Sequence, residues 1–395
     1  MVGNLEARIQ RIVRNARQLL VRADDCDSLP FPRATVMKTI HAAGYLLWLS
    51  LLVTGCEENK TPPPPVRTPV TPAVEPPDTA PALSAVSSGK SPETKHRPVE
   101  KLMDGAGLGK IIALHDGYVY WTTQAGIGSS SSDGKIIRLP MDGGIPQEVA
   151  GGLDNITSLA FGDGNVFWTM CGTIEHVQRC RITQTPTSGG KRNLVFDAGP
   201  NQVAYAVWAG THLLWAEATN KSVMKTDTKQ PKPAALTATG DVTSMVSRDN
   251  DIFWSEGRAL APDGAIMRSS LSGPALAVSK GRRFPRHLLV DGDRLIWVEN
   301  SETEAGSVLH AIMTVEANGG EPKTIVKDLS HVEGIAVGGT KLLIMTSDTL
   351  TYVPKTGGES AVLVADLKSP AGPVATESHA YWISNDKIWR ISLQP

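Results

Sequence analysis

The segment FGDGNVFWTM, residues 161–170, holds the two features that decide the fold: a Gly-Asp-Gly turn and a β-rich run with a central tryptophan. The chain repeats this arrangement seven times. The centres are YVYWTT at Trp121, NVFWTM at Trp168, HLLWAE at Trp215, DIFWSE at Trp254, RLIWVE at Trp297, KLLIMT at Ile344 and HAYWIS at Trp382. They lie 47, 47, 39, 43, 47 and 38 residues apart, which is the spacing of propeller blades. We therefore predict an all-β fold, a seven-bladed β-propeller of four-stranded blades.

The second repeat shows four strands most clearly. Apolar and polar residues alternate over 156–161, 165–170, 179–186 and 192–196, and glycine-rich turns separate these runs. Gly-Gly pairs also follow the third strands of other repeats, where glycine supplies the positive φ that tight turns need. These glycines are predicted to be structural.

The seventh repeat ends early, because the chain stops at Pro395 after a third strand at 387–392. Just before the first repeat, residues 97–105 resemble the outer strands elsewhere, such as 322–329. We expect this N-terminal strand to complete the seventh blade and close the ring, which removes exposed sheet edges. The propeller domain is predicted to span residues 96–395.

Residues 37–55 differ in character from the propeller. A short charged segment at Met37 and Lys38 precedes an apolar run over 42–53, and Thr54, Gly55 and Cys56 follow. This resembles the bacterial lipoprotein signal peptide, whose lipobox ends in a cysteine that is lipidated and becomes the mature N-terminus. The run is shorter than the roughly 20 residues of a transmembrane helix. An uncleaved anchor followed by a coincidental Gly-Cys is the alternative.

Two segments flank this signal. Residues 1–36 contain a basic stretch that could form an amphipathic helix on an anionic surface, but the simpler interpretation is that Met37 is the initiator and 1–36 an extension outside the protein. Residues 56–95 are rich in proline and threonine, a composition that predicts a disordered tether. Glu57 stands where enteric bacteria commonly use aspartate for inner-membrane retention, so we expect the outer membrane of a Gram-negative envelope.

Four cysteines are consistent with export. Cys26 lies in the region that would be removed and Cys56 would carry lipid, which leaves Cys171 and Cys180 on either side of one predicted loop. In an oxidising compartment a disulfide between them is the natural interpretation. A metal site with His176 as a third ligand is the alternative, although closed zinc sites use four protein ligands.

The repeat centre resembles the YWTD family of propellers and related bacterial propellers of unknown function. Residues 120–123, YWTT, together with the strand and Asp-Gly turn at 136–144, carry the resemblance, which spans the whole ring. That family is six-bladed, whereas seven repeats are counted here. The aspartate that ends the family motif is replaced by Thr123, Met170, Glu217, Glu256, Glu299, Thr346 and Ser384.

The sequence contains no phosphate loop, zinc helix, nucleophile elbow or calcium loop of standard spacing. The Asp-Gly pairs at 116–117, 163–164 and 291–292 and the Asp-Asn-Asp segment at 249–251 fall in turns between first and second strands, where Asp, Asn and Gly are favoured for backbone reasons. With 39 basic and 40 acidic residues, the net charge of −1 does not favour nucleic-acid binding. We predict no catalytic residue, no metal and no cofactor.

Propeller topology places the loops that follow second and fourth strands on one face. Polar loops on a rigid scaffold are where binding usually occurs. Around the mouth of the central channel on this face we expect Asp154, Asn155, Asn201, Gln202, Asp241, Arg286, His287, His331 and Glu333.

Three classes of function remain. The ring, tether and lipid anchor favour an envelope interaction module that binds another envelope protein or a small ligand. A lyase or hydrolase similar to the streptogramin lyases would use His287, His331 and Glu333 at the channel mouth. A periplasmic carbohydrate or peptide sensor would need exposed aromatic residues, for which Trp208 and Trp389 lie outside the repeat centres.

Overall fold

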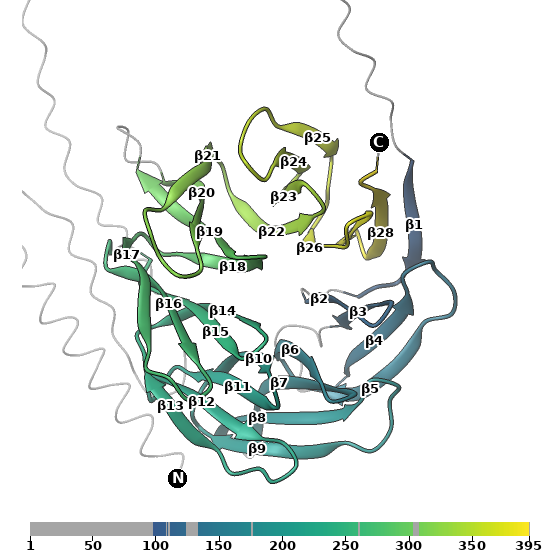
Figure 1. Cartoon of the computed structure of the whole chain (residues 1–395). Helices are drawn as coiled ribbons and strands as arrows, with labels where there is room; N and C mark the ends of the chain where they lie inside the picture. Colours follow the sequence, from purple (N-terminus) through teal and green to yellow (C-terminus); the bar gives the residue numbers. More distant parts are fainter. Residues whose placement is uncertain are drawn as a thin grey trace, which may run out of the picture. The chain divides into compact units, whose positions relative to one another are not determined.

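The strands of the structure are built from alternating apolar and polar residues. The structure is a computed structural model and describes residues 98–107, 109, 111–123, 133–174, 177–259, 261–302 and 308–394. These residues form 28 strands in seven antiparallel sheets of four, and no helix. The sheets surround a common centre (Figure 1). The predicted seven-bladed propeller is therefore confirmed. The predicted extension, signal peptide, lipidated Cys56 and tether lie outside the described residues.

Each blade has an innermost and a second strand. The innermost strands are β2 (Ile112–His115), β6 (Ile156–Gly162), β10 (Val203–Ala209), β14 (Val242–Arg248), β18 (Arg286–Asp291), β22 (Val332–Gly338) and β26 (Ala371–Ala375). The second strands are β3 (Tyr118–Thr123), β7 (Asn165–Ile174), β11 (His212–Glu217), β15 (Asp251–Glu256), β19 (Arg294–Glu302), β23 (Lys341–Thr346) and β27 (His379–Ser384).

The third and fourth strands complete each sheet outward from the centre. The third strands are β4 (Gly134–Pro140), β8 (Val177–Pro186), β12 (Ser222–Asp227), β16 (Gly264–Ser270), β20 (Val308–Glu316), β24 (Leu350–Pro354) and β28 (Lys387–Ser392). The fourth strands are β5 (Gln147–Leu153), β9 (Asn193–Gly199), β13 (Ala234–Ala238), β17 (Leu276–Arg282), β21 (Lys323–Leu329), β25 (Ala361–Val364) and β1 (Val99–Asp104).

The ring closes as predicted, with the first strand of the chain in the last blade. The order of that sheet is β1-β28-β27-β26, and β1 pairs antiparallel with β28 from Val99 opposite Ile391 to Asp104 opposite Lys387. Figure 1 shows β1 beside β28 at the two ends of the described chain. The N-terminal strand thus joins residues nearly 300 positions apart into one ladder.

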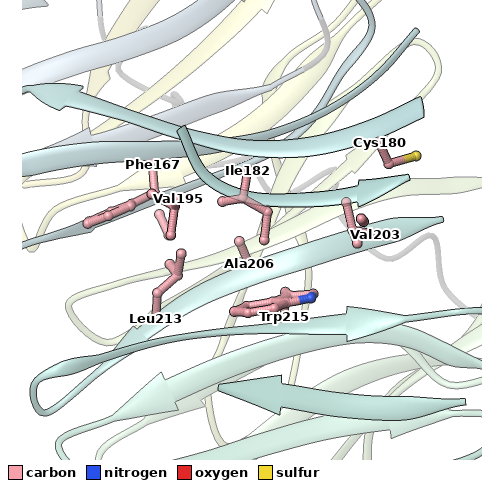
Figure 2. Packing of buried hydrophobic residues seen from close by; sticks show 10 residues of the cluster. Phe167, Cys180, Ile182, Val195, Val203, Ala206, Leu213 and Trp215 are labelled. Atoms are coloured by element: carbon pink, nitrogen blue, oxygen red, sulfur yellow. The ribbon is translucent and has the colours of Figure 1, made fainter. Parts of the chain in front are cut away.

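The core consists of layers between neighbouring blades. In a strand, successive side chains point to opposite faces, so the tryptophan and the residue before it face different neighbours. Phe167 and Trp215 accordingly pack in one cluster between blades 2 and 3, and Figure 2 shows this layer. Six of the seven repeat centres are tryptophans that are at most 1% exposed.

The same pairing recurs around the ring. At each interface, the residue before one repeat centre lies in the same cluster as the repeat centre of the next blade. The other pairs are Tyr120 and Trp168, Leu214 and Trp254, Phe253 and Trp297, Ile296 and Ile344, Leu343 and Trp382, and Tyr381 and Trp121. Each large aromatic side chain removes about 150–250 Å² from water, so these layers dominate the stability of the ring.

The acidic turns serve the backbone, as predicted. Asp116 and Asp163 adopt φ of 45° and 48°, and the glycine after each adopts 76° and 70°. Two successive positive φ values are the geometry of the tight turn that matches strand twist. Asp249 adopts a φ of 55° in the corresponding turn of blade 4.

Candidate functional site

One face of the ring carries the start of every innermost strand, and we call it the strand-start face. In each described sheet the start of the first strand pairs with the end of the second, as Ile156 does with Met170. A repeated bond fixes this end, because the carbonyls of Asn155, Gln202 and Asp241 accept N–H groups from Cys171, Ala218 and Gly257. All nine residues expected at the channel mouth lie on this face. Their role in binding stays a prediction.

A β-bulge marks the start of most innermost strands. The register shifts there in β6, β10, β14, β18, β22 and β26. In β10 and β18 the bulge gives Tyr205 and His287 positive φ values of 54° and 51°. Bulges re-aim side chains and occur beside functional sites.

Hydroxyl groups at two of these bulges hold adjacent blades in register. Ser158 Oγ accepts the N–H of Ala206 at 3.0 Å, and Ser244 Oγ accepts the N–H of Leu288 at 3.1 Å. The preceding threonines also donate across blades, Thr157 to the carbonyl of Val203 in β10 and Thr243 to the carbonyl of Pro285, the residue before β18. The bulges are therefore rigid parts of the ring.

Among the described strands, those of two hairpins are longer than the rest and extend beyond the strand-start face. The strands β7 and β8 have ten residues each and β19 and β20 have nine, whereas most others have six or seven. The sequence pattern predicts that the second strand of blade 2 ends at Met170 and that Cys171 to Cys180 form a loop. The ladder instead runs on to Ile174 opposite Val177, because the β-branched residues here favour strand pairing.

The predicted disulfide is present at the base of this extension. Cys171 and Cys180 are directly opposite each other, with a Cα–Cα distance of 4.1 Å. Both sulfurs are therefore used, and the alternative metal site with these cysteines is not formed. His176 lies outside the described residues.

A cluster of basic and imidazole side chains occupies the strand-start end of blade 5. Arg286, the first residue of β18, donates to Asn300 Oδ1 at 2.9 Å and to the carbonyl of Phe284 at 3.4 Å. Its second terminal nitrogen lies 2.8 Å from Nε2 and 3.1 Å from Nδ1 of His310. His310 Nδ1 also accepts the backbone N–H of Val332 at 2.9 Å, which links blades 5 and 6.

Burial sets the charge state of this cluster. It lowers the pKa of Arg286. Burial, the Arg286 charge and His331 lower the pKa of His310 to about 4. Burial and the charges of Arg286 and His310 likewise lower the pKa of His287 to about 4. At neutral pH the guanidinium is therefore the cation of the cluster, and both imidazoles are neutral.

The remaining predicted residues have separate surroundings. His331 Nε2 lies 3.2 Å from Glu333 Oε1, and the His331 and His310 rings are 6.0 Å apart. Asp241 forms an ion pair with Lys221 at 3.1 Å. The structure therefore brings together Arg286, His287 and His331, and leaves the polar residues of blades 2, 3 and 4 elsewhere on the same face.

Sequence reasoning missed three members of this face: Tyr205, Asn300 and His310. Tyr205 is 36% exposed at its bulge, and burial raises its pKa. Asn300 and His310 are opposite each other on β19 and β20. Only the extension of that hairpin brings these two side chains to Arg286, and no local sequence motif indicates this contact.

Three further observations on the described residues concern metal sites, membrane-spanning helices and pockets. No group of three or more His, Cys, Asp and Glu side chains there could hold a metal ion. Nor does this part of the chain contain a helix long and apolar enough to cross a membrane. A pocket of about 400 Å³ lies between outer strands of blades 1 and 2, where Lys135, Glu148 and Arg192 line it, and it includes none of the nine predicted residues.

Known structures resemble this chain at the level of fold. The extracellular domain of a putative one-component system from B. thetaiotaomicron aligns with a TM-score of 0.54 and 11% identity, over 74% of this chain and 40% of that one. A prolyl endopeptidase aligns with a TM-score of 0.51 and 12% identity, over 69% and 44%. These similarities establish the fold alone.

A chain of the nidogen/laminin complex aligns with a TM-score of 0.42 and 16% identity, over 56% of this chain and 86% of that one. No protein-family model and no curated protein matches the chain. The propeller spans less than half of each of the two structures with higher TM-scores, so activities of those whole proteins are not transferred here.

Proposed function

We propose that this chain is an envelope lipoprotein whose propeller is a non-catalytic binding module, with the strand-start face as its binding surface. Two long hairpins, from blades 2 and 5, extend beyond this face, and this observation carries the proposal. Extended elements on a rigid scaffold enclose a ligand at low entropic cost, because they are ordered before binding. The sequence supports the tether and the lipid anchor at Cys56.

A lyase or hydrolase is the second candidate, and the shifted pKa values of His287 and His310 favour it. Two observations count against this role. An imidazole with a pKa of about 4 is a weak general base at neutral pH. In addition, the Nδ1 lone pair of His310 already accepts a hydrogen bond from the N–H of Val332.

A carbohydrate or peptide sensor would need aromatic rings on the face. The structure uses the two candidate tryptophans elsewhere: Trp208 stacks on Phe167 at 5.3 Å, and Trp389 Nε1 donates to the carbonyl of Ser384. Tyr205 is the exposed aromatic residue of the described face. The binding module therefore remains the better supported function.

Site-specific photo-crosslinking in the native envelope tests the proposal. A photoreactive phenylalanine analogue in place of Tyr205 should give a discrete crosslinked product. The matched control replaces Tyr118, which begins β3 at the opposite end of the strands and packs under Arg138. Equal crosslinking from both positions, or none from Tyr205, would refute binding at this face.

A further inference from the structure

Arg286 differs electrostatically from other arginines of the ring. Hydrogen bonding to Asp263 raises the pKa of Arg258. Burial lowers the pKa of Arg390, but Glu100 and Tyr381 together outweigh it, so that this pKa is also raised. Arg286 is partly buried. Its hydrogen-bond partners among the described residues are Phe284, Asn300 and His310, and none of them is a carboxylate. A buried cation without an anion retains much of its desolvation cost.

Hydrogen-bond donors outnumber acceptors beside the Arg286 guanidinium. A neutral imidazole has one acceptor nitrogen, and in His310 that is Nδ1, which accepts the N–H of Val332. The ring proton is then on Nε2, which faces a guanidinium nitrogen at 2.8 Å. Both groups are donors, and an oxygen that accepted from both would satisfy them.

We propose that Arg286, together with the Nε2–H of His310, binds an oxyanion of the ligand, a carboxylate or phosphate group, at the strand-start face. This inference rests on the proposed function and names the chemistry that the face recognises. Asn300 orients the guanidinium through its hydrogen bond to Oδ1. The planar guanidinium fork matches the spacing of two oxyanion oxygens.

Arg268 provides a matched control. It donates to Asn318 Oδ1 and to the carbonyl of Ala317, so it resembles Arg286 in having an asparagine and a carbonyl as partners. It lies near the end of β16, at the opposite end of the strands. General electrostatic attraction of anions would respond to both arginines, whereas the proposed site depends on Arg286.

The test is an NMR titration of the full chain, labelled at histidine, with malonate and separately with inorganic phosphate, against chloride at equal ionic strength. We expect saturable shifts of the His287 and His310 signals. Arg286→Gln should weaken binding by about tenfold or more, the effect of losing a hydrogen bond to a charged group. Arg268→Gln should bind as the wild type does.

Tighter binding of malonate would identify a carboxylate source and tighter binding of phosphate a phosphoryl source. Equal affinity in Arg286→Gln, or shifts confined to other histidines, would overturn the site. The wild-type shifts alone decide the matter if that variant does not fold. Crosslinking from Tyr205 in the absence of anion binding would leave the proposed function standing and refute only this inference.

Discussion

Glu256 and Glu299 occupy the last position of the repeat motif, where the YWTD family has aspartate, and each accepts the indole N–H of the tryptophan two residues earlier, at 3.2 Å and 2.8 Å. Glu256 also accepts from Thr239 Oγ1 and from the N–H of Gly240. Burial raises the pKa of Glu299. These acids therefore stabilise the repeat through hydrogen bonds to the tryptophan of their own blade.

Also at the residue scale, the lowered pKa of His310 predicts how the stability of the fold depends on pH. Its pKa of about 4 in the folded chain lies below the unfolded value near 6.5, so the unfolded state binds more protons between these values. Stability is therefore full above about pH 6.5 and falls as the pH drops towards 4. His310→Gln should flatten this dependence in urea unfolding measured at pH 7 and pH 5. An unchanged slope would contradict it.

At the scale of elements, ladders decide which segments are rigid. The extension of β7 and β8 is one continuous ladder with a disulfide across it. In blade 5 the extended ladder of β19 and β20 places Asn300 opposite His310. Both hairpins thus project from the strand-start face, and the blade 5 hairpin also positions Asn300 and His310 beside Arg286.

Removing the disulfide should weaken the blade 2 hairpin. The chain-entropy model gives about 2 to 3 kcal/mol for so short a loop. Cys171→Ser combined with Cys180→Ser should lower the free energy of unfolding by about this amount in chemical denaturation. Reduction of the wild type should produce the same loss. If the double variant is as stable as the oxidised wild type, the bond contributes nothing to folding.

The closing strand makes a larger contribution than a single bond. β1 adds a full ladder to β28, and Leu102 and Met103 pack against a buried cluster that includes Trp121. Deletion of residues 96–104 should lower stability by roughly several kcal/mol, since a strand and its buried side chains are lost. Thermal unfolding measures this. Deletion of residues 61–90, within the predicted tether, should leave the melting temperature unchanged. If both truncations melt at the temperature of the full mature domain, β1 does not close the ring.

At the scale of the whole molecule, the ring and the preceding chain have separate predicted tasks. The ring presents one face with two long hairpins, and the predicted tether and lipid would hold it at an envelope membrane. Attachment confines the propeller near its partners and so raises their effective concentration. The predicted anchor would therefore favour binding by confining the ring to the membrane.

The predicted anchor is Cys56. An apolar run followed by Thr54 and Gly55 motivates this prediction. Metabolic labelling with palmitate in the native host should mark the wild type and leave Cys56→Ala unlabelled, because lipid is attached through that sulfur. Immunoblotting controls for expression. Label that persists in the variant would show that lipid is attached to another residue and that Cys56 is not the anchor.

The sequence by itself determined the number of blades, the strand order and the closing strand. It could do so because strand periodicity and turn residues are local signals that the chain repeats seven times. The position of Trp168 and Phe167 within one strand already implies that they face different blades, since side chains alternate. The disulfide was also predicted from the sequence, because the predicted export leaves one pair of cysteines, Cys171 and Cys180.

Only the tertiary structure decided which polar residues meet. Arg286 and His310 are 24 residues apart, and the extended ladder of β19 and β20 brings their side chains into contact. The bulges that turn Tyr205 and His287 onto the face depend on packing between adjacent blades, as in the bonds from Ala206 to Ser158 and from Leu288 to Ser244. Burial then makes the imidazoles neutral, and burial is a property of the assembled ring that no short stretch of sequence contains.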